Sequence, residues 1–310
     1  MIEDEELKNE IKRKILQLNV SLSENVEYDG ADHFEDVVLL QNNLSSVNPD
    51  EVDLSVEMYG KQLDSPLMIA PMVGGFKDAT KINEKIAESV KHFNIAMGVG
   101  NQIFGKLGPE HLKSYQVVRD VAPDALIFAN LWAKYFPQTP EYVDLIKVCI
   151  EMIDATAVEI PLSPLTELFY HTTASRGAHI TDYLENICES IEQPVIVRSL
   201  ESGFIHEDVQ QLWDLGVDGI DSQGMGGTDL VKIESLKHMS LAEKQSTYER
   251  KVFDYWGIHT IWSLLDIKLR EENHGIPLIV GGGIRNGLQA TKCLALGADM
   301  VSVGYPALIQ

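Results

Sequence analysis

Residues 279–285 read Ile279-Val280-Gly281-Gly282-Gly283-Ile284-Arg285, and residues 298–305 read Ala298-Asp299-Met300-Val301-Ser302-Val303-Gly304-Tyr305. Each stretch is an apolar run of strand length that ends in glycine, and a segment of helix length separates the two. Glycine lets backbone N–H groups approach a phosphate, because no Cβ stands in the way. Two such turns predict the phosphate site that follows strands seven and eight of a β/α barrel. The alternative is a pair of ordinary strand-to-helix turns, which are often rich in glycine.

Outward from this stretch, apolar runs of strand length alternate with amphipathic segments of helix length. Several runs are apolar on both faces, as expected for parallel strands that are covered on both sides. The predicted strands are residues 66–70, 95–99, 125–130, 157–160, 194–198, 219–221, 277–280 and 300–303. The predicted helices lie near residues 80–93, 109–121, 140–153, 180–191, 207–215, 257–269 and 285–296.

This alternation predicts an α/β protein with a closed (β/α)8 TIM barrel, whose chemistry lies on the loops after the strands. We expect residues 61–310 to form the barrel and the polar residues 1–60 to form an N-terminal extension or cap. The eighth helix is expected to be missing or truncated, because only residues 306–310 remain for it. An incomplete chain or a protein partner that covers the gap would account for this. The charged segment 232–250 is predicted to be a lid above the barrel mouth.

The amino-acid composition, above all its acidic residues, limits the kinds of molecule that the protein can bind. The 310 residues carry a formal net charge of −22, and so acidic a surface repels nucleic acid and anionic lipid. We therefore expect neither nucleic acid nor a membrane as a partner. The first residues are acidic where a signal peptide would be basic, and no apolar run approaches the ~18 residues of a membrane span. Three cysteines without paired spacing indicate free thiols, and together these features predict a cytoplasmic protein.

Side chains at the other strand ends indicate what the barrel mouth binds. Asn101 follows the second strand, Asn130 ends the third, and Thr228 lies in the glycine-rich turn after the sixth. Arg198 is the only cation at a predicted strand end, and we expect it to meet an anion; the alternative is a salt bridge to Glu159 of the neighbouring strand. Amides, one guanidinium and glycine turns at one mouth predict a site for flavin mononucleotide (FMN).

Several short motifs occur in order between about residue 51 and residue 305. They are Met72-Val73-Gly74-Gly75, Gly100-Asn101-Gln102, Leu126-Ile127-Phe128-Ala129-Asn130-Leu131, Gly226-Gly227-Thr228 with Lys232-Ile233-Glu234, Trp256-Gly257-Ile258 and Gly282-Gly283-Ile284. As an ordered set they resemble type 2 isopentenyl diphosphate isomerase, an FMN-dependent β/α barrel that is related to the α-hydroxy acid oxidases. The resemblance implies a small-molecule substrate and a homo-oligomer.

The resemblance also implies roles for individual residues. Those expected to face the flavin ring are Met72, Val73, Asn101, Asn130 and Arg198. Those expected to hold the phosphate end are Thr228, Gly282, Gly283, Arg285, Gly304 and Tyr305. Arg198 takes the place of a family lysine, and as a cation it would stabilise negative charge near the N1 and O2 atoms of the ring. Thr166 takes the place of a glutamine implicated in proton handling, and Glu167 matches the glutamate that holds Mg²⁺.

The substrate half departs from the family pattern. The family carries Gln-x-His-x-Asn-x-x-Gln-Glu after the fourth strand, whereas this chain reads Glu159-Ile160-Pro161-Leu162-Ser163-Pro164-Leu165-Thr166-Glu167. Pro161 and Ser163 therefore replace the histidine and asparagine that meet the diphosphate. The N-terminal Arg-Lys-x-x-His segment of the family has no clear equivalent, and residues 12–14 are a loose substitute. A diphosphate needs several donors, so these losses argue against the usual handling of isopentenyl diphosphate.

Three hypotheses follow from these residues. The first is an FMN-dependent isomerase of the family type, in which reduced FMN takes part in proton transfer. The second is an FMN-dependent oxidoreductase with a different substrate. The third is a non-catalytic barrel that serves as a subunit. Oxidation of a hydroxy acid ranks below the others, because residues 223–227 lack the histidine and arginine that the oxidases carry after strand six.

Overall fold

Eight parallel strands close into a barrel in the computed structural model, which describes residues 4–164, 179–230, 232–233, 253, 256–270 and 275–309. The strands follow one another around the barrel in chain order, and β10 pairs with β3 to close it, with Val301 opposite Leu67. Their bounds are β3 Leu67–Ile69, β4 Ala96–Gly98, β5 Ile127–Asn130, β6 Ala157–Leu162, β7 Val195–Ser199, β8 Gly219–Gln223, β9 Leu278–Gly281 and β10 Met300–Val303. The predicted TIM barrel is confirmed, and each predicted strand overlaps an observed one.

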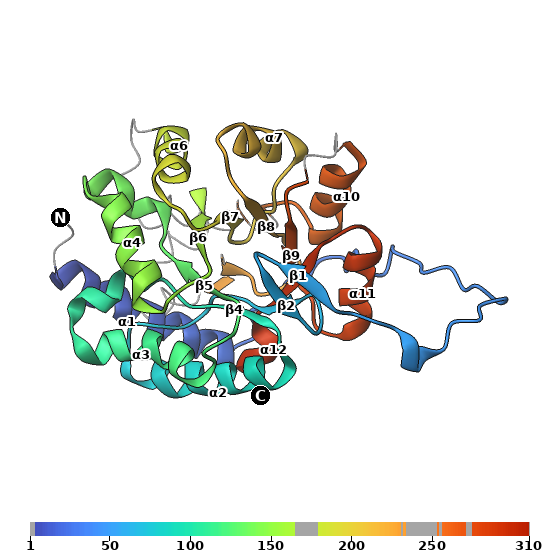
Figure 1. Ribbon diagram of the computed structural model, residues 1–310, viewed down its shortest axis with the longest axis horizontal. Coiled ribbons are helices and arrows are strands. Elements are labelled where there is room, and N and C mark those ends of the chain that lie inside the picture. The colour runs from blue at the N-terminus through green and yellow to red at the C-terminus, as the bar shows by residue number, and fades with distance from the viewer. Residues whose placement is uncertain are drawn as a thin grey trace.

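Helices cover the outside of the barrel (Figure 1). Their bounds are α2 Lys77–Phe93, α3 Pro109–Val121, α4 Tyr142–Met152, α6 Ile180–Ser190, α7 His206–Asp214, α10 Thr260–Arg270 and α11 Gly287–Ala295. The short helices η2 Gln102–Leu107 and η3 Ala133–Gln138 follow β4 and β5. Helix α2 illustrates why these segments are helical: Ala79, Ile86 and Val90 recur at helical spacing and are buried, and Asn94 ends the helix in the left-handed region. After β10 the chain forms only the short helix α12, Tyr305–Leu308.

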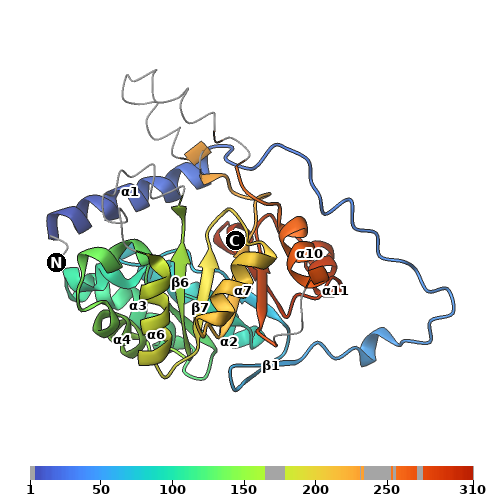
Figure 2. The ribbon, with the colours of Figure 1, turned by 90° about the horizontal axis from the view of Figure 1, so that it is seen from above.

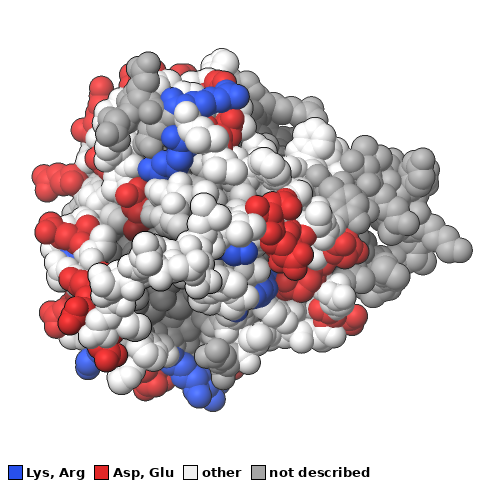
Figure 3. All heavy atoms as spheres, turned by 90° about the vertical axis from the view of Figure 1, so that its right-hand side faces the viewer, with Lys and Arg blue, Asp and Glu red and all other residues white. Residues whose placement is uncertain are grey.

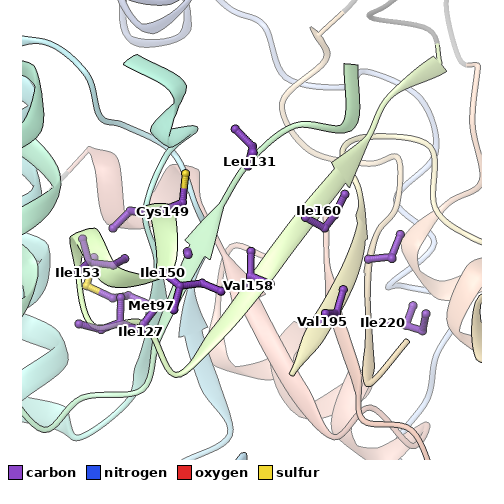
Figure 4. Packing of buried hydrophobic residues seen from close by; sticks show 14 of the residues in the cluster. Met97, Ile127, Leu131, Cys149, Ile150, Ile153, Val158, Ile160, Val195 and Ile220 are labelled. Carbon is purple, nitrogen blue, oxygen red and sulfur yellow. The ribbon is translucent and has the colours of Figure 1, made fainter. Parts of the chain in front are cut away.

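The strands bury both of their faces, each against a different apolar layer. Outward side chains such as Ile127, Val158 and Val195 pack against the helices, where Cys149 and Ile150 of α4 meet them (Figure 4). Inward side chains form a separate cluster at the N-terminal end of the barrel, which contains Met68, Ala96, Phe128, Ala157, Ile196, Ile279 and Met300. This double burial explains why the strand sequences read as nearly continuous apolar runs.

The residues before the barrel contact both of its ends. Helix α1, Asp4–Ser23, lies across the mouth toward which the tips of β6 and β7 point (Figure 2). The chain then runs outside the barrel, through η1 at Pro49–Glu51, to a hairpin of β1 Val56–Met58 and β2 Lys61–Leu63. Met58 and Leu63 of this hairpin join the inner apolar cluster and close the end of the barrel opposite α1. The expected boundary at residue 60 falls in the turn of this hairpin.

The surface is strongly acidic, in keeping with the net charge of −22. On the face shown in Figure 3, acidic side chains gather in several patches and basic side chains in smaller groups. Among the described helices, none has the length and apolarity that crossing a bilayer requires. Of the predicted lid at 232–250, only Lys232 and Ile233 belong to the described residues, so the rest of that prediction lies outside them.

Candidate functional site

The inward faces of the strands change from apolar to polar toward the mouth. Side chains alternate along a strand, so the residue two positions beyond each member of the inner cluster faces the barrel interior as well. On β5, β6 and β7 these next positions hold Asn130, Glu159 and Arg198, and on β10 the position holds Ser302. On β8 the residue in register with Arg198 is Asp221, and all five are buried. On β3, β4 and β9 the same tier holds only Ala70, Gly98 and Gly281. One half of this tier is therefore polar, and the other half is small.

A cavity of about 320 Å³ opens above this tier, at the carboxyl ends of the strands. Its volume lies at the lower end of the range that is typical of cofactor sites. The structure brings all the residues predicted to contact FMN into its lining: Met72, Val73, Asn101, Asn130, Arg198, Thr228, Gly282, Gly283, Arg285, Gly304 and Tyr305. These residues come from seven different strand ends, which only barrel closure places around one space.

Two turns at one side of the cavity, Gly282–Gly283 and Gly304–Tyr305, will be called the glycine turns. Gly282 and Gly283 have φ values of +99° and +74°, which residues with a side chain rarely adopt. A Cβ on Gly283 would lie 2.5 Å from the carbonyl oxygen of Gly226, so the packing also requires glycine. Among the described residues, no acceptor receives the N–H groups of Gly283, Gly304 and Tyr305. Free backbone donors beside an open space suit a phosphate.

Arg285 reaches the same side of the cavity but is already paired. Its Nη2 lies 2.6 Å from Glu27 Oε2, and its guanidinium carbon lies 5.2 Å from the centre of the Tyr305 ring. Glu27 belongs to the segment after α1, whose neighbour Tyr28 donates its N–H to the carbonyl of Gly227. Arg285 therefore fastens the N-terminal segment to the glycine turns, and any charge that it offers a phosphate is shared with Glu27.

Two asparagines of the cavity wall differ in how their side-chain polar atoms are hydrogen-bonded. The Asn101 amide donates to the Tyr135 hydroxyl, which in turn donates to Glu10 of α1 at 2.6 Å, so this amide holds α1 in place. The Asn130 side-chain oxygen is buried and has no partner among the described residues, and the Asn130 N–H donates to Gln102. Ser302 Oγ is likewise buried without a described partner. Unpaired buried polar atoms beside a cavity indicate a missing ligand group.

Arg198 lies at the floor of the cavity. Sequence analysis predicted that it meets either an anionic ligand or Glu159, and the structure bears on both contacts. It lines the cavity, and its Nε has no hydrogen-bond partner among the described residues. Its Nη1 lies 2.5 Å from Asp221 Oδ2 and 3.5 Å from Glu159 Oε2. The salt bridge to Glu159 is therefore present but long, and Asp221 is the stronger partner. We call Glu159, Arg198 and Asp221 the charged cluster.

Sequence analysis missed Asp221, because nothing in the run Gly219 to Gln223 marks it as a partner of a residue on another strand. Gln223, which lines the cavity, donates its amide to the same carboxylate. Burial raises the pKa of Asp221, against the opposing effect of the Arg198 cation. Burial also raises the pKa of Glu159, to about 8, with Arg198 opposing the shift and Asp221 adding to it. A signal was available in retrospect: charged residues inside two otherwise apolar strands need a common counter-ion.

Helix α1 supplies two more residues: Lys14, which sequence analysis gave only as part of a loose substitute for the family's Arg-Lys-x-x-His segment, and Gln17, which it missed. Lys14 and Gln17 lie one helical turn apart and line the cavity from above. They stand in the order Arg13-Lys14-Ile15-Leu16-Gln17, so the N-terminal Arg-Lys pattern is present, with glutamine in place of the histidine. Burial lowers the pKa of Lys14 to about 8, although Glu10 opposes the shift. An ammonium and an amide at the mouth are donors suited to an anionic ligand.

The predicted catalytic residue Thr166 and the predicted magnesium ligand Glu167 lie outside the described residues. Across the described ranges, no group of three or more His, Cys, Asp or Glu side chains is arranged to hold a metal ion. Arg198 is thus the one member of the predicted catalytic set that the structure places, and it lies at the cavity floor.

Known proteins with the same fold carry flavin. A mandelate oxidase variant, which holds a monooxide FMN adduct, is 16% identical with a TM-score of 0.58, over 95% of this chain and 78% of its own. Flavocytochrome b2 is 16% identical with a TM-score of 0.60, over 89% of this chain and 66% of its own. These likenesses show the fold alone. The model of the FMN-dependent dehydrogenase family matches residues 159–310.

Sequence relatives are closer. The isopentenyl-diphosphate delta-isomerase of Pyrococcus abyssi is 35% identical to this chain over 304 residues, which cover 96% of the chain and 80% of the relative. The enzyme of the same name from Methanothermobacter thermautotrophicus is 32% identical over 296 residues, with the same coverage of 96% and 80%. That similarity runs through both the barrel and the N-terminal helix that carries Lys14. The chain belongs to the isopentenyl-diphosphate delta-isomerase family, in its FMN-dependent type 2 form.

Proposed function

We propose that the cavity binds FMN, with its phosphate at the glycine turns and its ring above the charged cluster. The observation that carries this proposal is the lining of the cavity: free backbone N–H groups at one side, and unpaired polar atoms of Asn130, Arg198 and Ser302 at the floor. The first set fits an anionic tail, and the second set fits the polar edge of a flavin ring. Met72 and Val73 would supply the apolar wall against which the ring lies.

We propose further that the protein interconverts isopentenyl diphosphate and dimethylallyl diphosphate. When bound and reduced, FMN supplies proton-transfer chemistry at the allylic position. The chain itself would bind the diphosphate through Lys14 and Gln17 above the cavity, while α1 and Trp132 exclude water from the ring. Glu167 would hold Mg²⁺ on the diphosphate, so activity should fall on addition of EDTA and return with Mg²⁺. This small-molecule enzyme would act in the cytoplasm.

A second candidate is an FMN-dependent oxidoreductase with another substrate. The observation in its favour is the end of β6, where Pro161 and Ser163 stand at positions that hold diphosphate donors in the family. Ser163 is buried and donates to Glu201, so its hydroxyl is directed to a carboxylate of the protein. Lys14 and Gln17 offset part of this loss, which is why the isomerase ranks first. A non-catalytic role ranks last, because the relatives are named as isomerases.

Deuterium exchange separates these functions. Purified protein, FMN reduced with dithionite, Mg²⁺ and isopentenyl diphosphate are incubated in D₂O, and the products are examined by mass spectrometry. An isomerase forms dimethylallyl diphosphate that contains deuterium. If neither product nor exchange occurs at high enzyme concentration, the isomerase proposal fails. Bleaching of oxidised flavin by a different reductant or hydroxy substrate under anaerobic conditions would then support the oxidoreductase.

We also propose that the protein is a homo-oligomer. The segment between α1 and β1 exposes apolar side chains far more than a monomer needs: Val38 is 74% exposed, Leu40 91% and Leu44 93%. Apolar residues that are clustered on an extended segment favour contact with another protein surface. Light scattering on a size-exclusion column would give a mass that is a multiple of 34.6 kDa if this is correct.

A further inference from the structure

The charged cluster has more negative than positive groups. Two carboxyl groups, Glu159 and Asp221, are both 0% exposed and approach the same guanidinium nitrogen of Arg198. Asp221 makes the short contact and also accepts the Gln223 amide, whereas neither oxygen of Glu159 has a hydrogen-bond partner among the described residues. Asp221 is therefore well placed as the ionised member of the pair, and Glu159, which Arg198 approaches only to 3.5 Å, is the member better placed to hold a proton.

No other described charge is available to balance the second carboxylate. The inward positions of β3, β4, β9 and β10 at this level are Ala70, Gly98, Gly281 and Ser302, none of which is charged at neutral pH. Below the cluster, the ring of Tyr59 packs edge-on against Phe128 and its hydroxyl reaches the Asp218 carbonyl. Burial raises the pKa of Tyr59, and the carboxylates of Asp218, Glu159 and Asp221 add to that shift, so it stays neutral.

We propose that Glu159 and Asp221 share one proton beneath Arg198, so that the floor of the cavity is neutral when the proton is held and carries one negative charge when it is lost. An unpaired buried carboxylate carries a large desolvation cost, and retention of a proton removes that cost. Two carboxyl groups that face one cation in a dry site cannot both ionise easily. The pair must then be described as one titrating unit.

This arrangement is a property of this chain. The family pattern has glutamine at the position of Glu159, a side chain that carries no proton to lose, whereas Asp221 and the cation at Arg198 would form a neutral pair by themselves. Here the added carboxyl converts a fixed charge balance into one that depends on pH. Glu159 does not line the cavity, so it acts through Arg198 as a positioning residue for charge and does not itself touch a ligand.

The consequence for ligand binding rests on the proposed FMN site. Reduced flavin carries negative charge on its ring, and oxidised flavin does not. With the proton in place, Asp221 balances the charge of Arg198 and the cluster is neutral; once Glu159 ionises, the cluster is negative and repels the charge on the ring. The protein should then favour reduced over oxidised FMN less strongly at alkaline pH. We expect the ratio of the two dissociation constants to change by roughly tenfold or more, because one buried charge is added beside the ring.

The first test measures the proton directly. The full chain is labelled with ¹³C at the glutamate side-chain carboxyl, and its NMR spectrum is followed as a function of pH. One glutamate should titrate near pH 8, where the burial of Glu159 and its neighbour place the pKa. That resonance should be absent in Glu159→Gln and should titrate at lower pH in Asp221→Asn, because the second carboxylate is gone. If all glutamates titrate near their ordinary pKa of 4.5, the shared proton does not exist.

The second test measures the coupling to the ligand. Dissociation constants for oxidised FMN and for dithionite-reduced FMN are compared between neutral and alkaline pH. The ratio should fall by roughly tenfold in the unmodified chain and should stay constant in Glu159→Gln. A glutamate that titrates near pH 8 with an unchanged ratio would overturn the coupling. If FMN does not bind at all, the proposed function fails, and the NMR titration still decides whether the proton is shared.

Discussion

The two sides of the barrel mouth are built in different ways. At the carboxyl ends of β9 and β10, the glycine turns present backbone N–H groups, and hardly any side chain takes part. At the ends of β6, β7 and β8, the charged cluster presents side chains, and all three are nearly or fully buried. The first side binds through a backbone shape that glycine permits, and the second binds through the balance of charges. The glycine turns line the cavity directly and the charged cluster reaches it through Arg198, in a protein whose net charge is −22.

This difference shows how an acidic protein can hold an anionic cofactor. The glycine turns need no net positive charge, because partial charges on oriented N–H groups act at short range. The buried cation Arg198 lies at the floor of the cavity and is offset by Asp221. The comparison therefore predicts that changes at the glycine turns remove the ligand, whereas changes in the charged cluster alter its properties.

The largest expected effect is at the glycine turns. In Gly282→Asp, the new Cβ would press on the carbonyl of Gly224 and lie 2.8 Å from Thr260 Oγ1, and the carboxylate would repel the phosphate. We expect loss of FMN, measured as loss of visible flavin absorption after reconstitution and desalting. Gly275→Asp is the matched control: Gly275 also has a positive φ, of +70°, but is exposed, with no described atom near its added Cβ.

Both variants place an aspartate at a position of positive φ, and Gly282→Asp adds the contact with the Gly224 carbonyl; circular dichroism checks that both proteins remain folded. A yellow Gly282→Asp protein with full FMN content would contradict the placement of the phosphate. Equal loss of FMN in Gly275→Asp would mean that strain alone, and not the position of the turn, removes the ligand.

The next effect is at Arg198. Arg198→Ala leaves two buried carboxyl groups without a counter-ion, and loss of one partner of a buried ion pair typically costs about 3–5 kcal/mol of folding free energy. FMN should still bind, but its reduction potential should fall, because a cation that favours the reduced ring is gone. Arg198→Lys keeps the charge and should retain most of the potential. An unchanged potential in a folded Arg198→Ala protein would show that the guanidinium does not act on the ring.

The sequence predicted the barrel and the glycine-turn side of the site well, because both depend on local signals. Apolar runs locate the strands, and glycine at 282, 283 and 304 marks the turns without reference to any other part of the chain. The charged cluster was predicted less well. Glu159 and Arg198 were paired correctly as neighbours, but Asp221 is 23 residues from Arg198 and 62 from Glu159, and only the barrel geometry joins them. Lys14 was given only as part of a loose match, because nothing local shows that α1 crosses the mouth.

A smaller effect is expected at Lys14, which tests whether the N-terminal helix takes part in substrate binding. Lys14→Ala should raise the KM for isopentenyl diphosphate by about 10- to 100-fold, the typical loss for one charge-assisted hydrogen bond, with a smaller change in kcat. Lys12→Ala removes the same charge from an exposed position of α1 and should have little effect.

The pH dependence of this KM provides a further check. The pKa of Lys14 is near 8, so its ammonium is lost as the pH rises above that value, and the KM of the unmodified enzyme should increase there. Lys14→Ala should lack that increase. If the KM of both proteins changes in parallel with pH, the titrating group is not Lys14.

The smallest effect concerns stability and isolates Glu159. Its folded pKa, near 8, lies above the ordinary value of 4.5, so the folded chain binds more protons than the unfolded chain between these pH values. The contribution of Glu159 to stability is therefore present at low pH and is lost as the pH rises toward 8. Glutamine carries no such proton, so Glu159→Gln should gain stability relative to the unmodified chain across this window in urea denaturation. The exposed Glu84→Gln is the control and should show no such gain.

The central claim is that backbone N–H groups at the ends of β9 and β10 hold the phosphate of FMN. It is tested most directly by reconstituting the purified chain with FMN and with riboflavin, which has the same ring without the phosphate, and measuring both dissociation constants by flavin fluorescence. The account predicts tight binding of one FMN per chain and much weaker binding of riboflavin, with the difference abolished in Gly282→Asp. Equal affinity for the two flavins, or no binding of either, would contradict it.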